Sequence, residues 1–116
     1  MGNTRPYTNG ALTATVVDVS TRCEGILKGL QAYNPNTSDV WVQVFKVAAA
    51  SVTLGTTTPV LSFLVPKGDG TNRGAYVDDF VAGISLGGVA VSVAATTTRA
   101  GSTAPSTAIE VNMQYL

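Results

Sequence analysis

The sequence predicts an all-β protein, a single-domain antiparallel β-sandwich or jelly-roll-like fold of about eight strands. A chain of 116 residues is the size of one domain. No window shows a helical apolar stripe, and Thr, Val and Gly are abundant, which favours strands and turns. Short alternating segments separated by Gly, Pro and Asn recur along the chain, as in sandwiches and barrels.

The first ten residues, MGNTRPYTNG, are polar and contain Pro6 and Gly10. They predict an N-terminal arm over 1–10, either frayed or ordered on binding, ahead of a sandwich domain over 11–116. No apolar run follows this polar start, so no signal peptide is expected and synthesis in a cytoplasm without export is the simplest interpretation.

The first strand is expected over 11–19, where Leu12, Ala14 and Val16 alternate to one side. Further strands are expected over 25–34, 40–47, 52–55, 59–66, 74–80, 83–86, 89–96 and 108–116. A turn separates the second and third segments, because Pro35 fixes φ within NPNTSD. The polar, glycine-rich stretch 66–74 predicts a hairpin connection.

Two of these segments carry more information than the rest. VWVQVFKV (40–47) is apolar on both faces, with Trp41 and Phe45 on one side and Val42 and Val44 on the other. It is expected to be a central strand or to be covered by a partner chain. The last segment, 108–116, alternates cleanly and is expected to be paired on both sides or held within an assembly.

Seven Lys and Arg balance seven Asp and Glu, for a net charge of zero. Binding to nucleic acid or to an anionic membrane surface would favour a cationic excess, so neither is expected. The uncharged run 81–98 contains Gly, Ser and Thr and predicts strands rather than a transmembrane segment. So little charge protects weakly against self-association. Much of the surface is therefore expected to be covered, a plain soluble monomer being the alternative.

The chain lacks the usual groups for catalysis. It has no His and one Cys, Cys23, which is expected to act as a small hydrophobic residue. Asp78 and Asp79 are adjacent on a predicted strand and so point to opposite faces. The GDGTN stretch at 68–72 lacks the closing glutamate of an EF-hand. We therefore predict that the chain has no catalytic, cofactor or metal site and that it is not an enzyme.

Five motifs stand out along the chain: YNP (33–35), WVQVF (41–45), VTLGTTTP (52–59), GIS (83–85) and VAATTT with GSTAP (93–105). Together they resemble a family of small structural proteins of tailed bacteriophages. The family is similar to capsid decoration, or cement, proteins. The resemblance implies a sandwich on the outer surface of a phage head, often a homotrimer. It also implies binding to the major capsid protein and to sister subunits, with no catalytic residues.

Small hydroxyl side chains lose little rotamer entropy on docking. The Thr-rich loop 96–106 and the TTTP stretch at 56–59 are therefore predicted to pack against neighbouring subunits. The candidate interface residues are Thr56, Thr57, Thr58, Thr96, Thr97, Thr98, Arg99 and Tyr115. The alternative function is a tail, fibre or head-surface module that binds host carbohydrate, which would need Trp41 or Tyr76 exposed as a stacking platform rather than packed in the core.

Overall fold

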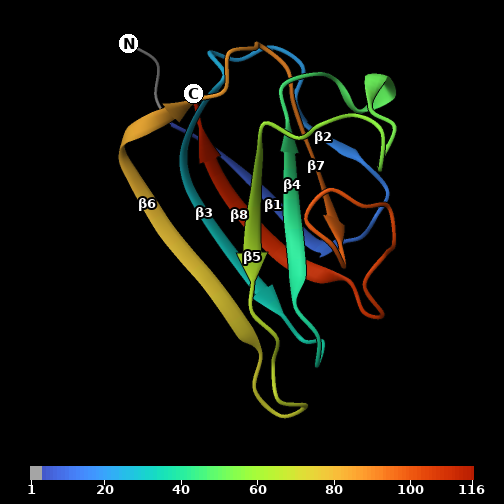
Figure 1. The fold of residues 1–116 in the computed structure, drawn as a ribbon. Helices are drawn as coiled ribbons and strands as arrows, with labels where there is room; N and C mark the ends of the chain where they lie inside the picture. Colours follow the sequence, from blue (N-terminus) through green and yellow to red (C-terminus); the bar gives the residue numbers. More distant parts are fainter. Residues whose placement is uncertain (1–3) are drawn as a thin grey trace.

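The computed structural model describes residues 4–116 and confirms the all-β prediction, with two four-stranded antiparallel sheets packed face to face (Figure 1). The elements in chain order are β1 (Arg5–Leu12), β2 (Val17–Ser20), β3 (Ile26–Asn34), β4 (Val40–Phe45), the short 3₁₀ helix η1 (Ala49–Ser51), β5 (Leu61–Val65), β6 (Gly74–Ser85), β7 (Val91–Thr96) and β8 (Ile109–Tyr115).

The strands pair as one long folded hairpin. β1 pairs with β8, β2 with β7, β3 with β6 and β4 with β5, all antiparallel. The resulting order is β1-β8-β3-β6 in the first sheet, which we call sheet A, and β2-β7-β4-β5 in the second, sheet B. This nested pairing of eight strands over two sheets is the jelly-roll arrangement, which joins strands far apart in the sequence.

The core lies between the two sheets, where each strand contributes every second residue. Leu30, Ala32, Val111 and Met113 face inward from sheet A, and all are fully buried. Val42 and Val44 of β4 and Val93 and Ala95 of β7 meet them from sheet B. These alternating apolar positions account for the segments that the sequence predicts most clearly.

Both expectations about strand position are confirmed. β4 lies between β7 and β5, and β8 lies between β1 and β3. The final strand is therefore paired on both sides within the chain itself. No helix among residues 4–116 has the length and apolar character needed to cross a membrane. The uncharged run 81–98 supplies the end of β6 and the whole of β7.

The predicted arm over 1–10 is wrong for the residues that the structure describes. β1 begins at Arg5 and pairs with β8 from Arg5 opposite Tyr115 to Leu12 opposite Ile109. Residues 1–3 of the predicted arm lie outside the described part. The predicted strand 11–19 is broken instead, because the chain leaves sheet A after Leu12 and enters sheet B at Val17. The sequence did not predict β1 because most of its side chains are exposed, so the segment lacks the apolar alternation of a buried strand.

The region before β5 also differs from the prediction. Residues 52–55 form no strand, and the amides of Thr56 and Thr57 donate to the carbonyl of Thr53 in a tight turn. The polar stretch 66–74 is no hairpin, since it links β5 in sheet B to β6 in sheet A. Both segments have strong turn residues, but local composition does not tell which sheet the next strand joins.

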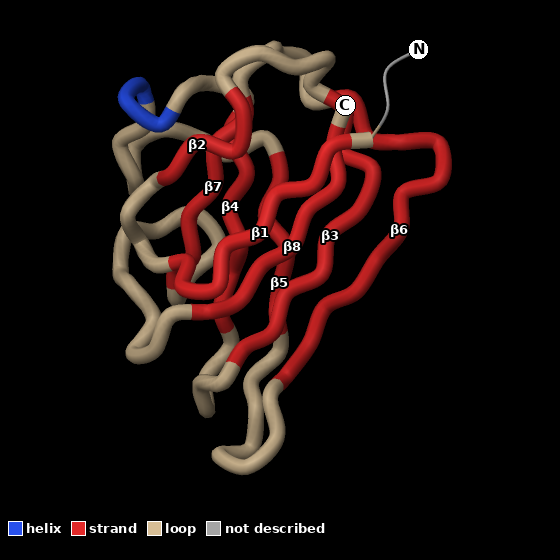
Figure 2. Tube along the Cα trace, turned by 180° about the vertical axis from the view of Figure 1, so that it is seen from behind, coloured by secondary structure: helices blue, strands red, loops and turns tan. Residues whose placement is uncertain are grey.

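The segments 74–80 and 83–86 are one strand, β6, rather than two. The register with β3 shifts between Leu27 and Gly29, so that β6 bends outward after Asp79 (Figure 2). Gly83 takes φ +78° at this bend, a conformation that glycine adopts without strain. The predicted strand 89–96 begins only at Val91, because Val89 precedes β7 and is 63% exposed.

Candidate interaction surfaces

Most outward residues of the two central strands of sheet B are buried, although they face away from the core. Gln43 and Phe45 of β4 point outward, and so do Ser92 and Thr96 of β7. All four have relative exposures of 0–1%. Because no partner chain is needed for this burial, other segments of the same chain must cover the face.

The connection from β4 to β5 covers one end of this face. The Ser92 hydroxyl donates to the Val47 carbonyl at 2.8 Å. The Ala49 amide, at the start of η1, donates to Asp18 Oδ1 at 2.7 Å. This connection therefore crosses from β4 to β2 and closes over the Phe45 ring, which is 1% exposed.

The predicted loop 97–106 covers the other end. Gln43 Nε2 donates to Thr96 Oγ1 at 2.6 Å and to the Gly101 carbonyl at 3.0 Å. Thr96 Oγ1 in turn donates to the Thr98 carbonyl at 2.8 Å. The Ser62 hydroxyl on β5 donates to the Arg99 carbonyl at 2.7 Å. Three strands thus hold the loop by its main-chain carbonyls.

We call the connection from β4 to β5 and the loop 97–106 together the cover. The two Thr-rich segments, which are far apart in sequence, lie side by side on it. A Cβ placed on Gly55 would lie 3.7 Å from the Cβ of Ser102. The sequence predicts that both segments pack against neighbouring subunits. The structure brings them together, on the outside of sheet B.

The candidate interface residues divide into three groups. Thr56, Thr58, Thr98 and Arg99 are exposed on the cover. Thr57 and Thr97 are half-buried, and Thr57 Oγ1 accepts a hydrogen bond from the Thr53 amide at 2.9 Å. Thr96 is fully buried and serves the fold of its own chain.

Tyr115 does not belong with this group. It lies in β8 opposite Arg5 and Leu27, in sheet A, whereas the Thr-rich loop precedes the other end of β8 (Figure 1). Its half-buried ring packs against the core between the sheets. The Thr-rich cover and Tyr115 are therefore separate features.

Trp41 and Arg99 form the aromatic part of the covered face. The Trp41 ring is half-buried, and the guanidinium carbon of Arg99 lies 5.9 Å from its centroid, within cation–π range. Leu64 of β5, which lies opposite Trp41 of β4, is 39% exposed. Trp and Arg are the residue types that most often dominate protein interfaces.

The other proposed platform residue, Tyr76, belongs to a different sheet. Its ring lies 5.4 Å from that of Phe63, which also stacks on Phe80 at 5.9 Å. Partial burial and the hydrogen bond from its hydroxyl to Asp78 raise the pKa of Tyr76. Tyr76 and Trp41 therefore do not form one stacking surface.

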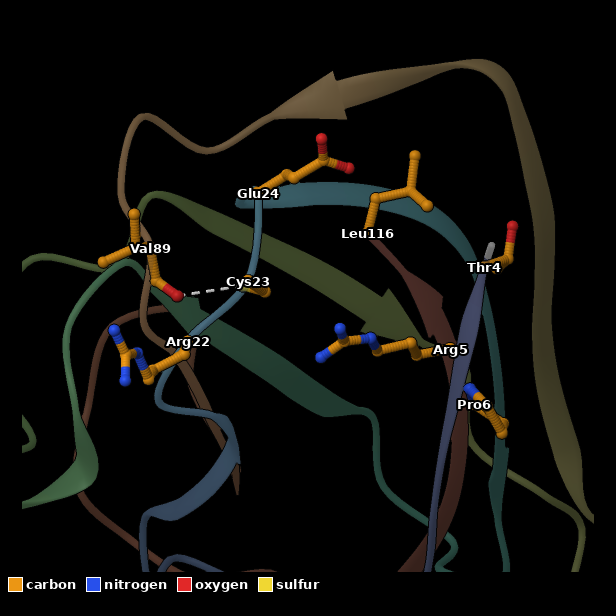
Figure 3. Close-up of a pocket in the computed structure, with 8 residues that line it drawn as sticks. All are labelled: Thr4, Arg5, Pro6, Arg22, Cys23, Glu24, Val89 and Leu116. Carbon is orange, nitrogen blue, oxygen red and sulfur yellow. Dashed lines mark hydrogen bonds between the residues drawn. The ribbon is translucent and has the colours of Figure 1, made fainter. Parts of the chain in front are cut away.

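A hollow of about 730 Å³ opens between the start of β1 and the segment before β3 (Figure 3). It is lined by Thr4, Arg5, Pro6, Arg22, Cys23, Glu24, Val89 and Leu116. The Cys23 thiol donates to the Val89 carbonyl at 3.0 Å and accepts from the Gly25 amide at 3.3 Å. Cys23 is half-buried and packs against the core, as the sequence predicts for a small hydrophobic residue.

The carboxylates are dispersed. Asp78 and Asp79 lie opposite Leu30 and Gly29 respectively, and so point to opposite faces of sheet A. Amides of Asn72 and Thr71 donate to Asp69, which lowers the pKa of Asp69 and closes the turn at GDGTN. Within residues 4–116 no three His, Cys, Asp or Glu side chains are grouped to hold a metal ion.

The residues that hold the cover, above all Gln43 and Ser62, were not predicted from the sequence. One signal was present, because Gln43 is the one polar residue within VWVQVF (40–45). A buried amide needs hydrogen-bond partners beyond its own strand. In the described part of the chain, Gln43 Oε1 has none, while Nε2 has two.

The second surface is the free edge of β6. β6 is the last strand of sheet A, and Val77 and Val81 on it are 64% and 89% exposed. Figure 1 shows it as the outermost strand.

No family model, curated protein or solved structure matches this chain.

Proposed function

We propose that the chain is a structural virion protein, a capsid decoration protein that binds the outside of a phage head as a homo-oligomer and stabilises it. The partner is the major capsid protein, and the resemblance implies a trimer. One structural observation supports this: the Thr-rich motifs of the resemblance, 52–59 and 93–105, lie side by side on one outer face. Motifs gathered on one surface suit a shared contact.

The way this surface is built also suits docking. The cover is tied to β4, β5 and β7 through its carbonyl groups, so its exposed hydroxyls are held in place before binding. A preorganised surface of short side chains loses less entropy on association than one of long flexible side chains. Trp41, Leu64 and Arg99 at its margin supply larger groups.

The test is binding to undecorated heads of the encoding phage. Purified protein is expected to sediment with the heads, to saturate, and to raise their melting temperature, because a ligand of the assembled lattice stabilises it. Thr98→Glu, on the cover, is expected to weaken binding at least tenfold, since a buried, unpaired charge costs several kcal/mol. Thr8→Glu, an exposed threonine on β1, is the matched control. Absence of binding by the unmodified chain would contradict the proposal.

The carbohydrate alternative has less support. Jelly rolls occur in both capsid proteins and lectins, so the fold does not separate the two functions. A stacking platform needs aromatic rings exposed on one surface. Trp41 and Tyr76 are each half-buried and lie on different sheets.

A further inference from the structure

β6 has one regular half and one distorted half. Residues Gly74–Asp79 pair one to one with β3, from Asn34 to Gly29. Beyond Asp79 the register shifts, and Lys28 Nζ donates to the Val81 carbonyl at 2.9 Å. Bulges and edge lysines are devices that prevent sheets from pairing with other chains. The distorted half has the bulge, and a lysine of the neighbouring β3 occupies its Val81 carbonyl, whereas the regular half has neither feature.

The regular half also has an unused side. Among residues 4–116 no strand pairs with β6 except β3. Figures 1 and 2 both show its far side open along the whole strand. Alternate residues of an edge strand present main-chain N–H and C=O groups that a further strand can bind.

The side chains of this half divide between the two faces of the sheet. Tyr76 and Asp78 lie opposite the buried Ala32 and Leu30, and so face the inside of the sandwich. Ala75 and Val77 face outward, as does Asp79. Arg73, just before the strand, also lies on the outer face, where its guanidinium contacts Tyr33 and Glu110.

Symmetry limits how two such edges can pair. A two-fold axis that relates antiparallel strands of one sheet runs perpendicular to it and keeps each side chain on its own face. Directly opposite residues share a face, so the axis must pass beside a residue and not between two. An axis beside Asp78 or Asp79 would place two like carboxylates opposite each other, which is destabilising.

An axis beside Tyr76 gives a self-complementary arrangement. Arg73 then lies opposite Asp79 of the second copy, and Ala75 lies opposite Val77 of the second copy, each pair twice. Both pairs are on the outer face. The Asp78 carboxylates, on the inner face, each lie opposite Gly74 of the other copy. They are two residues from the axis on either side, and so are about 14 Å apart along the strand.

We propose that two copies of the chain pair through the 73–79 edge of β6, antiparallel and centred on Tyr76. The two four-stranded copies of sheet A then form one sheet of eight strands. In the single chain the arginine points away from this edge, across β3, and must turn outward to make the contact. Its Nη1 donates to Glu110 Oε2 at 2.7 Å, and its guanidinium carbon lies 4.7 Å from the centroid of the Tyr33 ring. Pairing therefore requires Arg73 to leave Glu110 for Asp79 of the second copy.

The contact covers Val77 and is short, so the expected affinity is that of a small, transient interface. A two-fold contact produces even numbers of subunits. Where another surface forms a trimer, this contact joins two trimers, and many copies on one particle reinforce it. The proposal concerns the chain alone and does not rest on the proposed function.

The test is charge complementation between two variants. In Asp79→Arg both opposed pairs become Arg with Arg, and in Arg73→Glu both become Glu with Asp. Each variant alone is expected to self-associate at least tenfold more weakly than the unmodified chain in analytical ultracentrifugation. An equimolar mixture restores opposite charges at both pairs, and is expected to form a one-to-one heterodimer. A loss of folding in either variant cannot produce that recovery.

Two further variants complete the design. Val77→Lys disrupts the apolar pair without altering Arg73 or Asp79, and is also expected to weaken pairing at least tenfold. Arg99→Glu changes charge equally on the other sheet and is expected to leave pairing unchanged. The proposal is overturned if the unmodified chain stays monomeric at about 1 mM, a concentration at which even weak pairs form, or if the mixed variants do not pair. Head binding is measured separately, so either proposal can fail while the other stands.

Discussion

The outer faces of the two sheets are built differently. On sheet B, the outward residues of β4 and β7 are buried beneath loops of the same chain, and hydroxyl and amide side chains hold those loops by their carbonyl groups. On sheet A, the outward residues bond one another. Gln31 and Gln114 exchange hydrogen bonds of 3.0 Å across β3 and β8, and Arg73 pairs with Glu110.

This difference explains why β4 and β7 have apolar or uncharged residues on both faces, whereas β3 and β8 alternate. A strand that is apolar on both faces needs a cover, and here the chain supplies it. Sheet A keeps its outer face free, and the unpaired edge of that same sheet carries the self-complementary segment. The strands of sheet B are thus covered within the chain, whereas sheet A leaves one strand edge unpaired.

The largest expected effect comes from truncating a ring on each outer face. Phe45→Ala on sheet B is expected to cost about 3–5 kcal/mol, as for a core phenylalanine, although Phe45 lies outside the inter-sheet core. Tyr33→Ala on sheet A, which removes a half-buried ring beneath Arg73, is expected to cost about 1 kcal/mol. Urea unfolding measures both. Equal costs would show that the two faces are covered alike.

Much of this fold is predictable from alternation, because the core between the sheets needs an apolar residue at every second position. The segments 25–34, 40–47 and 108–116 are found for that reason. β1 is not, since its stability comes from main-chain pairing with β8 and its side chains are largely exposed. The burial of Thr96 is also not predictable, because it depends on a contact with Gln43 from another strand.

Two glutamines allow a matched comparison at smaller scale. Gln43→Ala removes both hydrogen bonds of a fully buried amide and leaves the Gly101 carbonyl without its donor. It is expected to cost about 2–3 kcal/mol. Gln31→Ala removes only a half-buried pair on sheet A and is expected to cost less than about 1 kcal/mol. Thermal and urea unfolding of the two variants would contradict this account if their order were reversed.

Removing one hydroxyl tests how the cover is held. Ser62→Ala eliminates the hydrogen bond to the Arg99 carbonyl and is expected to cost about 1 kcal/mol. Limited proteolysis should then cleave within 97–104 faster than in the unmodified chain. Thr8→Ala, an exposed threonine on β1 of sheet A, is the control and is expected to change stability by less than about 0.5 kcal/mol.

Arg99→Ala is expected to have a smaller effect on stability, about 0.5 kcal/mol, since the cation–π contact with Trp41 is partly exposed. The clearer change is optical. With the guanidinium removed, acrylamide should quench Trp41 fluorescence more strongly and the emission should move to longer wavelength. Unchanged quenching would mean that Arg99 does not cover the ring in solution.

The smallest effect is expected from the pH dependence of Tyr76 at the β6 edge. Its pKa is raised above the ordinary value of 10.0 by partial burial and by the Asp78 carboxylate, so folding favours the neutral phenol. Its contribution is therefore complete below pH 10 and is lost as pH rises through the raised pKa. Tyr76→Phe should lessen the decline in stability above pH 10, measured by urea unfolding at several pH values. An identical decline in both proteins would show that Tyr76 contributes nothing.

The central claim is that sheet B is covered by its own chain and needs no partner. Hydrogen exchange of the isolated protein, at a concentration where it is monomeric, tests this most directly. The account predicts that the amides of β4 and β7 are among the slowest to exchange, and that those of the covering loop which make hydrogen bonds, such as Thr97, are measurably protected. Rapid exchange throughout 97–104 and along β7, slowed only when a capsid or a second subunit is added, would contradict it.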